Sequence, residues 1–196
     1  MNRLRPAFLA FAALIIAVAG APSISSPAQA AMSDPGIAIG TKAPLALALK
    51  DSSGKPTTLA SQMGAKGMVV ILVRSADWCP YCKAQLIDLN NVRADLAKQG
   101  YALVSVSYDA PKTLVGFAQT RKIAFPMLSD TGSRMIDALR LRDPQYKGMD
   151  RIDGVPYPTT LVLSKDGTVR AKHVSTDYRV RQSNVDLRAM VASVAR

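Results

Sequence analysis

A chain of 196 residues, of which 48% are hydrophobic, is long enough to bury a core of its own, and this excludes a disulfide-stapled mini-protein. The formal net charge is +11, from 25 Lys and Arg residues against 14 acidic residues. The basic residues are spread along the chain and do not form one stripe with stacking aromatic residues. The charge therefore does not indicate nucleic-acid binding, and we interpret it as a solvated surface.

The first 30 residues follow the plan of a secretory signal peptide. Arg3 and Arg5 precede an apolar run over residues 7–20, and Ala28-Gln29-Ala30 is a small-x-small cleavage pattern. The apolar run is shorter than the roughly 20 residues that a membrane-spanning helix needs, which disfavours an uncleaved anchor. We therefore expect cleavage near Ala30, export to the periplasm or extracellular space, no stable membrane insertion, and a single domain over residues 31–196.

The rest of the chain alternates between strand and helix patterns. The runs at residues 68–73 and 101–107 are continuous and apolar, which is typical of strands buried on both faces. The alternation predicts an α/β fold: a central mixed sheet with helices on both faces and an N-terminal β-hairpin extension. Strands are predicted at 45–49, 55–59, 68–73, 101–107, 125–128, 159–163 and 168–174, and helices at 80–99, 111–122, 131–141 and 183–194.

The two cysteines stand three residues apart in Trp78-Cys79-Pro80-Tyr81-Cys82, between the strand at 68–73 and the helix that starts at Pro80. With Cys79 at the N-cap and Cys82 one turn on, the two side chains are close enough for a disulfide. Lowering a thiol pKa from ~8.5 to ~7 takes about 2 kcal/mol, which a partly buried helix N-terminus supplies. We therefore predict Cys79 as the exposed attacking thiolate and Cys82 as the resolving thiol.

Other uses of a cysteine pair fit the sequence less well. A zinc site needs four ligands, or three and a water, and without carboxylates that the sequence does not mark, the two cysteines and the lone His173 leave such a site short. Covalent haem attachment requires a histidine where Lys83 stands. We expect no metal and no other cofactor, while a purely structural disulfide remains an open alternative.

A second feature is Tyr157-Pro158-Thr159, just before the predicted strand at 159–163. From composition alone it is an ordinary loop proline at the start of a strand. Together with the WCPYC segment and the order of elements, however, it resembles the thioredoxin-like superfamily over residues 37–196. The resemblance implies that Pro158 is a cis-proline against the disulfide, that the Tyr157 backbone pairs with a substrate chain, and that Trp78 shields the disulfide. Pro80 and Tyr81 are expected to support the same site.

Within this superfamily, residues 40–44, 104–111 and 125–130 look most like the peroxiredoxin-like branch, the alkyl hydroperoxide reductase/thiol-specific antioxidant proteins. The branch places Thr three residues and Pro seven residues before its peroxidatic cysteine, where this chain has Ala76 and Leu72.

The arginine that the branch places beside that cysteine has no clear match, since Tyr157-Pro158 stands at its position. Arg74 lies close in sequence, but an arginine at the end of a strand is more typical of a surface charge. Asp77 and Asp109 are candidates for proton relay, although a turn or capping role suits each of them better.

Three functions follow, in order of preference. The leading hypothesis is thiol–disulfide exchange with a protein or small-molecule disulfide or thiol, in which Cys82 resolves a mixed disulfide on Cys79. The alternative is a thiol peroxidase, in which Cys79 attacks a hydroperoxide and Cys82 condenses with the sulfenic acid. Both require an external thiol donor or acceptor. The third is a binding module that has lost redox activity, against which the intact Cys79, Cys82 and Pro158 argue.

Overall fold

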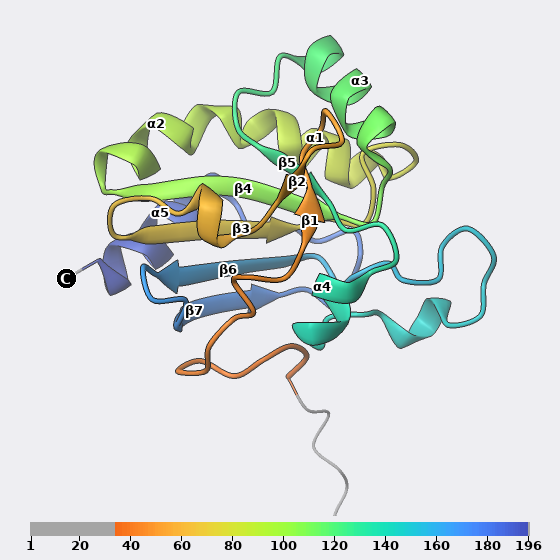
Figure 1. Cartoon of the computed structure of the whole chain (residues 1–196). Coiled ribbons are helices and arrows are strands. Elements are labelled where there is room, and N and C mark those ends of the chain that lie inside the picture. The colour runs from red at the N-terminus through yellow and green to blue at the C-terminus, as the bar shows by residue number, and fades with distance from the viewer. Residues whose placement is uncertain (1–33, 196) are drawn as a thin grey trace, which may run out of the picture. The chain divides into compact units, whose positions relative to one another are not determined.

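A mixed seven-stranded sheet forms the centre of the fold, in the order β2-β1-β5-β4-β3-β6-β7 (Figure 1). The computed structural model describes residues 34–195, so the expected signal peptide lies outside the described residues. Strands β3, β4 and β5 are mutually parallel, whereas β6 runs antiparallel to β3 and β7 antiparallel to β6. The strands are β1 (Leu49–Lys50), β2 (Pro56–Thr57), β3 (Gly67–Leu72), β4 (Tyr101–Ser107), β5 (Met127–Ser129), β6 (Thr159–Ser164) and β7 (Val169–Val174).

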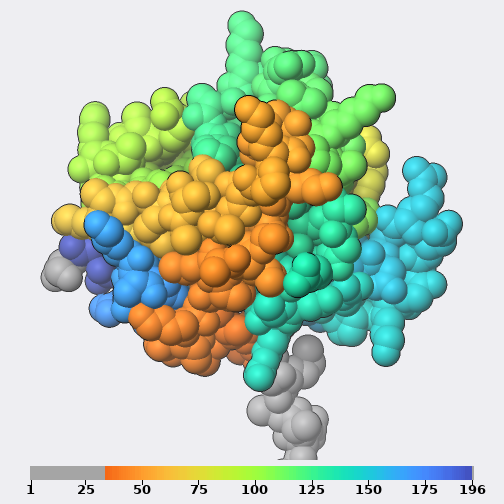
Figure 2. Space-filling model, in the orientation of Figure 1, coloured from red at the N-terminus to blue at the C-terminus, as the bar shows by residue number. Residues whose placement is uncertain are grey.

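The helices cover the two faces of this sheet unequally. Helices α1, α2, α3 and α5 pack on one face, and the short α4 packs on the other face together with the irregular N-terminal segment. Figure 2 shows residues 34–60 of that segment spread over the middle of the second face. The helices are α1 (Pro80–Asp88), α2 (Asn90–Lys98), α3 (Pro111–Arg121), α4 (Arg134–Ala138) and α5 (Asn184–Val194), with 3-10 turns η1 (Ala60–Gln62) and η2 (Pro144–Tyr146).

Strand β3 explains why the sheet can be covered on both sides. All six of its residues are buried, and alternate side chains enter different clusters: Val69 and Ile71 on one face, Met68 and Val70 on the other. The predicted three-layer α/β fold is thus confirmed. No helix among residues 34–195 is both long enough and apolar enough to cross a membrane.

The N-terminal hairpin is present but shorter than predicted. Strands β1 and β2 span only two residues each, and β1 joins the sheet through the pairing of Lys50 with Ser129. The predicted strand at 45–49 fails over most of its length because the Leu47 N–H donates to the carbonyl of Pro44, which makes this stretch a turn.

The predicted helix over 80–99 is two helices, α1 and α2, divided at Leu89. The Val92 N–H donates to the Leu89 carbonyl three residues back, which tightens the chain there. The Asn90 side chain accepts from the Ala124 N–H in the loop after α3.

Helix α4 is also shorter than the predicted 131–141. Ser133 and Arg140 have φ angles of 59° and 56°, a left-handed conformation that an α-helix cannot continue through. The two residues therefore bound the helix on either side.

Candidate active site

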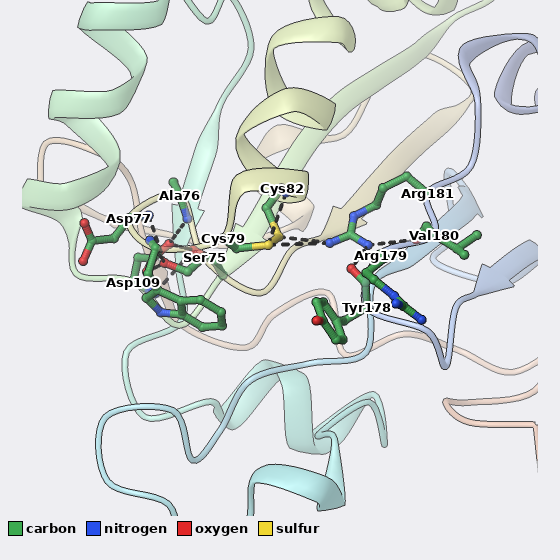
Figure 3. Close-up of a disulfide and its surroundings, with 12 residues drawn as sticks. Ser75, Ala76, Asp77, Cys79, Cys82, Asp109, Tyr178, Arg179, Val180 and Arg181 are labelled. Atoms are coloured by element: carbon green, nitrogen blue, oxygen red, sulfur yellow. Dashed lines mark hydrogen bonds between the residues drawn. A yellow bond between two sulfur atoms is a disulfide. The ribbon is translucent and has the colours of Figure 1, made fainter.

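The Cys79–Cys82 pair lies where the sequence places it, at the start of α1. Cys79 is the N-cap and Pro80 occupies the first turn, and the two cysteines form a disulfide with 5.3 Å between their Cα atoms. The Cys82 N–H donates to Cys79 Sγ at 3.2 Å, so a free N–H of the helix start is directed at the first sulfur (Figure 3). This geometry favours negative charge on Cys79 once the disulfide is reduced.

The expected exposure of Cys79 is wrong for this oxidised pair. Its exposed fraction is 1% and that of Cys82 is 0%. The reason is a segment that the sequence does not mark: residues 175–183, between β7 and α5, pass beside the disulfide and direct Arg181 at it (Figure 3). We refer to residues 175–183 as the strap.

The side chain of Arg181, in the strap, hydrogen-bonds to both sulfurs. Its Nη2 donates to Cys82 Sγ at 3.2 Å and to Cys79 Sγ at 3.7 Å, while Nη1 donates to the carbonyls of Tyr178 and Val180. Burial, followed by the nearby charge of Arg74, lowers the pKa of Arg181 to about 10. The side chain is therefore still a cation at neutral pH.

Arg74 is buried and is not the surface charge expected from its place at the end of a strand. Its guanidinium carbon lies 5.0 Å from the ring centroid of Trp78, 4.6 Å from that of Tyr146 and 4.7 Å from that of Tyr178. Three rings from separate segments thus surround one cation, an arrangement stabilised by cation–π attraction. Because Tyr178 belongs to the strap, this cluster helps to hold Arg181 beside the disulfide.

Tyr81 and Tyr108 contact this aromatic cluster from outside. The Tyr81 ring, 42% exposed, meets the Tyr178 ring edge-on with 6.0 Å between centroids. The Trp78 indole N–H donates to the Tyr108 hydroxyl at 2.9 Å, and the ring is 38% exposed. Shielding of the disulfide by Trp78 remains a prediction, since the ring contacts Tyr108 and Arg74.

Asp109 holds the loop that precedes Cys79. Its carboxylate accepts from Ser75 Oγ at 2.7 Å, from the Ala76 N–H at 2.7 Å and from Ser107 Oγ at 2.8 Å. Burial raises the pKa of Asp109, and these three hydrogen bonds oppose the increase. The position of Asp109 therefore favours a structural role over proton relay, because its carboxylate fixes the residues that lead into α1.

The expected cis-proline is wrong. All peptide bonds of the described residues, including Tyr157–Pro158, are trans. The Tyr157 N–H donates to the Leu141 carbonyl at 2.8 Å, and the Pro158 carbonyl accepts from the Ser175 N–H at 2.9 Å. The segment thus enters β6 already paired on both sides, and the Tyr157 N–H that a substrate chain would use is taken.

Comparisons with known proteins identify relatives of this chain. A model of the AhpC/TSA family matches residues 39–172. A putative peroxiredoxin of Mycobacterium tuberculosis is 28% identical over 142 residues, covering 72% of this chain and 85% of that protein. A thioredoxin-like protein of Bacillus subtilis is 30% identical over 145 residues, covering 72% and 74% of the two chains. The structure of peroxiredoxin Q from Xanthomonas campestris superposes with a TM-score of 0.66 at 23% identity, over 82% of this chain and 99% of that one, which supports the thioredoxin-like fold.

Proposed function

The chain belongs to the AhpC/TSA family, and we propose that it is a thiol peroxidase with Cys79 as peroxidatic and Cys82 as resolving cysteine. The sequence alone favours disulfide exchange. The peroxiredoxin relatives favour peroxidase activity over disulfide exchange, and so does the site.

The burial of Cys79 carries this proposal. At 1% exposure in the disulfide, the Cys79 sulfur offers no surface on which a folded partner protein could dock, and this favours a small hydroperoxide as the oxidant. The hydrogen bonds of Tyr157 and Pro158 point the same way, because both residues are already paired within the chain and cannot receive an extended substrate chain there.

The reaction takes two steps on this pair. The Cys79 thiolate attacks one peroxide oxygen, so that an S–O bond forms while the O–O bond breaks, and the alkoxide or hydroxide released takes up a proton. The Cys82 sulfur then attacks Cys79, water leaves, and the disulfide seen here results. An external dithiol returns two electrons and restores the pair.

Thiol–disulfide exchange is the second candidate. The similarity to a thioredoxin-like protein and the one-turn spacing of the two cysteines favour it. In this case the Cys79 thiolate attacks a partner disulfide and Cys82 displaces the reduced partner.

Two assays separate these functions. Purified protein is given hydrogen peroxide or an alkyl hydroperoxide with a dithiol reductant, and in parallel insulin with the same reductant. We expect peroxide consumption that Cys79→Ser abolishes, while Cys82→Ser forms a sulfenic acid on Cys79 that a carbon-acid reagent traps in one turnover. Insulin reduction without peroxide turnover would establish the second candidate, and activity in neither assay would indicate a binding module.

Export is a separate part of the proposal. The basic start, the apolar run and Ala28-Gln29-Ala30 support cleavage near Ala30 and a periplasmic or extracellular protein. Expression of the full chain in a bacterial host tests it, by fractionation and N-terminal sequencing. A mature chain that starts near residue 31 in the exported fraction is expected, and an uncut chain in the cytosol would contradict it.

A further inference from the structure

We propose that Arg181 is a catalytic residue: its guanidinium holds reduced Cys79 as a thiolate and orients the hydroperoxide against it. The part concerning peroxide rests on the proposed function, whereas the part concerning the thiolate does not.

The contacts of Arg181 in the oxidised pair lead to this assignment. Its Nη2 lies within hydrogen-bonding distance of both sulfurs, at 3.2 Å from Cys82 Sγ and 3.7 Å from Cys79 Sγ. A disulfide sulfur is a weak acceptor, whereas a thiolate is a full negative charge. The same donor therefore binds more strongly after reduction, as charge-assisted hydrogen bonds do.

The charge balance around Arg181 argues against a purely structural role. No carboxylate of residues 34–195 forms a salt bridge with it, although most of its side chain is withdrawn from water, and the nearby Asp177 is paired with Arg179 instead. Arg74, the other buried cation of the site, has no salt bridge either. A buried cation without a counter-charge is costly, and a thiolate at Cys79 supplies the missing negative charge.

Arg181 also has a donor left for the substrate. Its Nε is buried and has no hydrogen-bond partner among the described residues. Because Nη2 faces the sulfurs, the Nε–H can donate to a peroxide oxygen while Nη2 holds the thiolate. As the O–O bond breaks, negative charge grows on the leaving oxygen, and the cation stabilises it.

This chain lacks two groups that the branch uses beside its cysteine, and Arg181 can take their place. Ala76 offers no hydroxyl where the branch has Thr, and Tyr157-Pro158 occupies the position of the arginine that the branch places beside the cysteine. The strap is fixed at its start by the hydrogen bond from the Ser175 N–H to the Pro158 carbonyl. At its end Ser183 caps α5. Arg181 is therefore held in place from both sides.

The test measures the thiol pKa of Cys79 and the peroxide kinetics in Arg181→Met, with Arg179→Met as the matched control. Arg179 lies two residues away on the strap, is exposed and pairs with Asp177, so its loss removes the same charge without touching the sulfurs. The pKa comes from the ultraviolet absorbance of the thiolate against pH in reduced protein, and Cys82→Ser assigns the signal. This readout requires no peroxide.

In Arg181→Met we expect the pKa of Cys79 to rise by ~1–2 units, the effect of removing a neighbouring opposite charge. The kcat/KM for peroxide should fall about 100-fold, as for loss of one donor to a developing oxyanion. Arg181→Lys should restore most of the pKa but little of the turnover, since an ammonium lacks the planar fork. Should Arg181→Met fail to fold, Arg181→Gln replaces it in the same measurements.

A pKa and a kcat/KM in Arg181→Met that match those of Arg179→Met would overturn the inference. If the wild type consumes no peroxide but the pKa shift is found, the proposed function fails and the thiolate role of Arg181 stands. If the wild type consumes peroxide and the pKa does not move, the inference fails alone.

Discussion

Replacement of Asp109 by Ala should destabilise the protein by about 3 kcal/mol. The carboxylate accepts three buried hydrogen bonds, from Ser75 Oγ, the Ala76 N–H and Ser107 Oγ, at 2.7–2.8 Å. A buried donor left unpaired costs ~1–3 kcal/mol, and two of these donors are hydroxyls that rotate to other acceptors. Removal of a buried charge offsets part of the loss. We therefore take the lower end of the range, ~1 kcal/mol for each of the three hydrogen bonds, which gives about 3 kcal/mol.

Urea unfolding of the oxidised protein, followed by circular dichroism, measures this loss. Asp77→Ala is the control, because Asp77 lies in the same loop with its side chain exposed, and a change within ~0.5 kcal/mol is expected there. An Asp109→Ala variant less than about 1 kcal/mol below wild type would refute the reasoning, since it would mean that the carboxylate does not fix the loop.

The same residue gives a pH dependence with a defined sign. Burial raises the pKa of Asp109 above its ordinary value of 3.8, so the native state binds this proton more tightly than the unfolded state. The stability that it contributes is full below the unfolded pKa and is lost as the pH rises through the folded pKa. Relative to Asp109→Asn, wild type should therefore gain unfolding free energy as the pH falls towards 3.8. A slope of the opposite sign would show that the hydrogen bonds to the carboxylate outweigh its desolvation.

Two further changes test the strap. Tyr178→Ala removes the ring from Arg74 and Tyr81, contacts worth ~1–1.5 kcal/mol, so a small thiol should reduce the disulfide about 5–10-fold faster in stopped-flow measurements. Tyr178→Phe keeps the ring and should match wild type, and equal rates in all three proteins would contradict the role of the ring. Ser183→Ala removes the hydroxyl that accepts from the Asp186 N–H and should cost about 1 kcal/mol in urea unfolding. Ser193→Ala, near the other end of α5, is the neutral control, and equal unfolding midpoints for the two variants would argue against the cap.

Elements with local signals can be predicted from the amino-acid sequence alone. The continuous apolar run at 101–107 is β4 to the residue, and Pro111 starts α3 because its fixed φ angle suits a first helical turn. The Cys79–Cys82 pair is also a feature with a local sequence signal. A spacing of three at a helix start brings two side chains together whatever the rest of the chain does.

The surroundings of that pair, by contrast, depend on long-range packing and could not be predicted from the sequence. Arg181 stands 99 residues from Cys82 in sequence, and no periodicity or spacing links the two. The sequence predicts Arg74 to be a surface charge, and only the structure shows it enclosed by Trp78 and by two rings from distant segments, Tyr146 and Tyr178. The partners of Tyr157 and Pro158 likewise come from other parts of the chain. Burial, counter-charge and hydrogen-bond partners depend on which segments pack together, and these are the quantities that set the reactivity of Cys79.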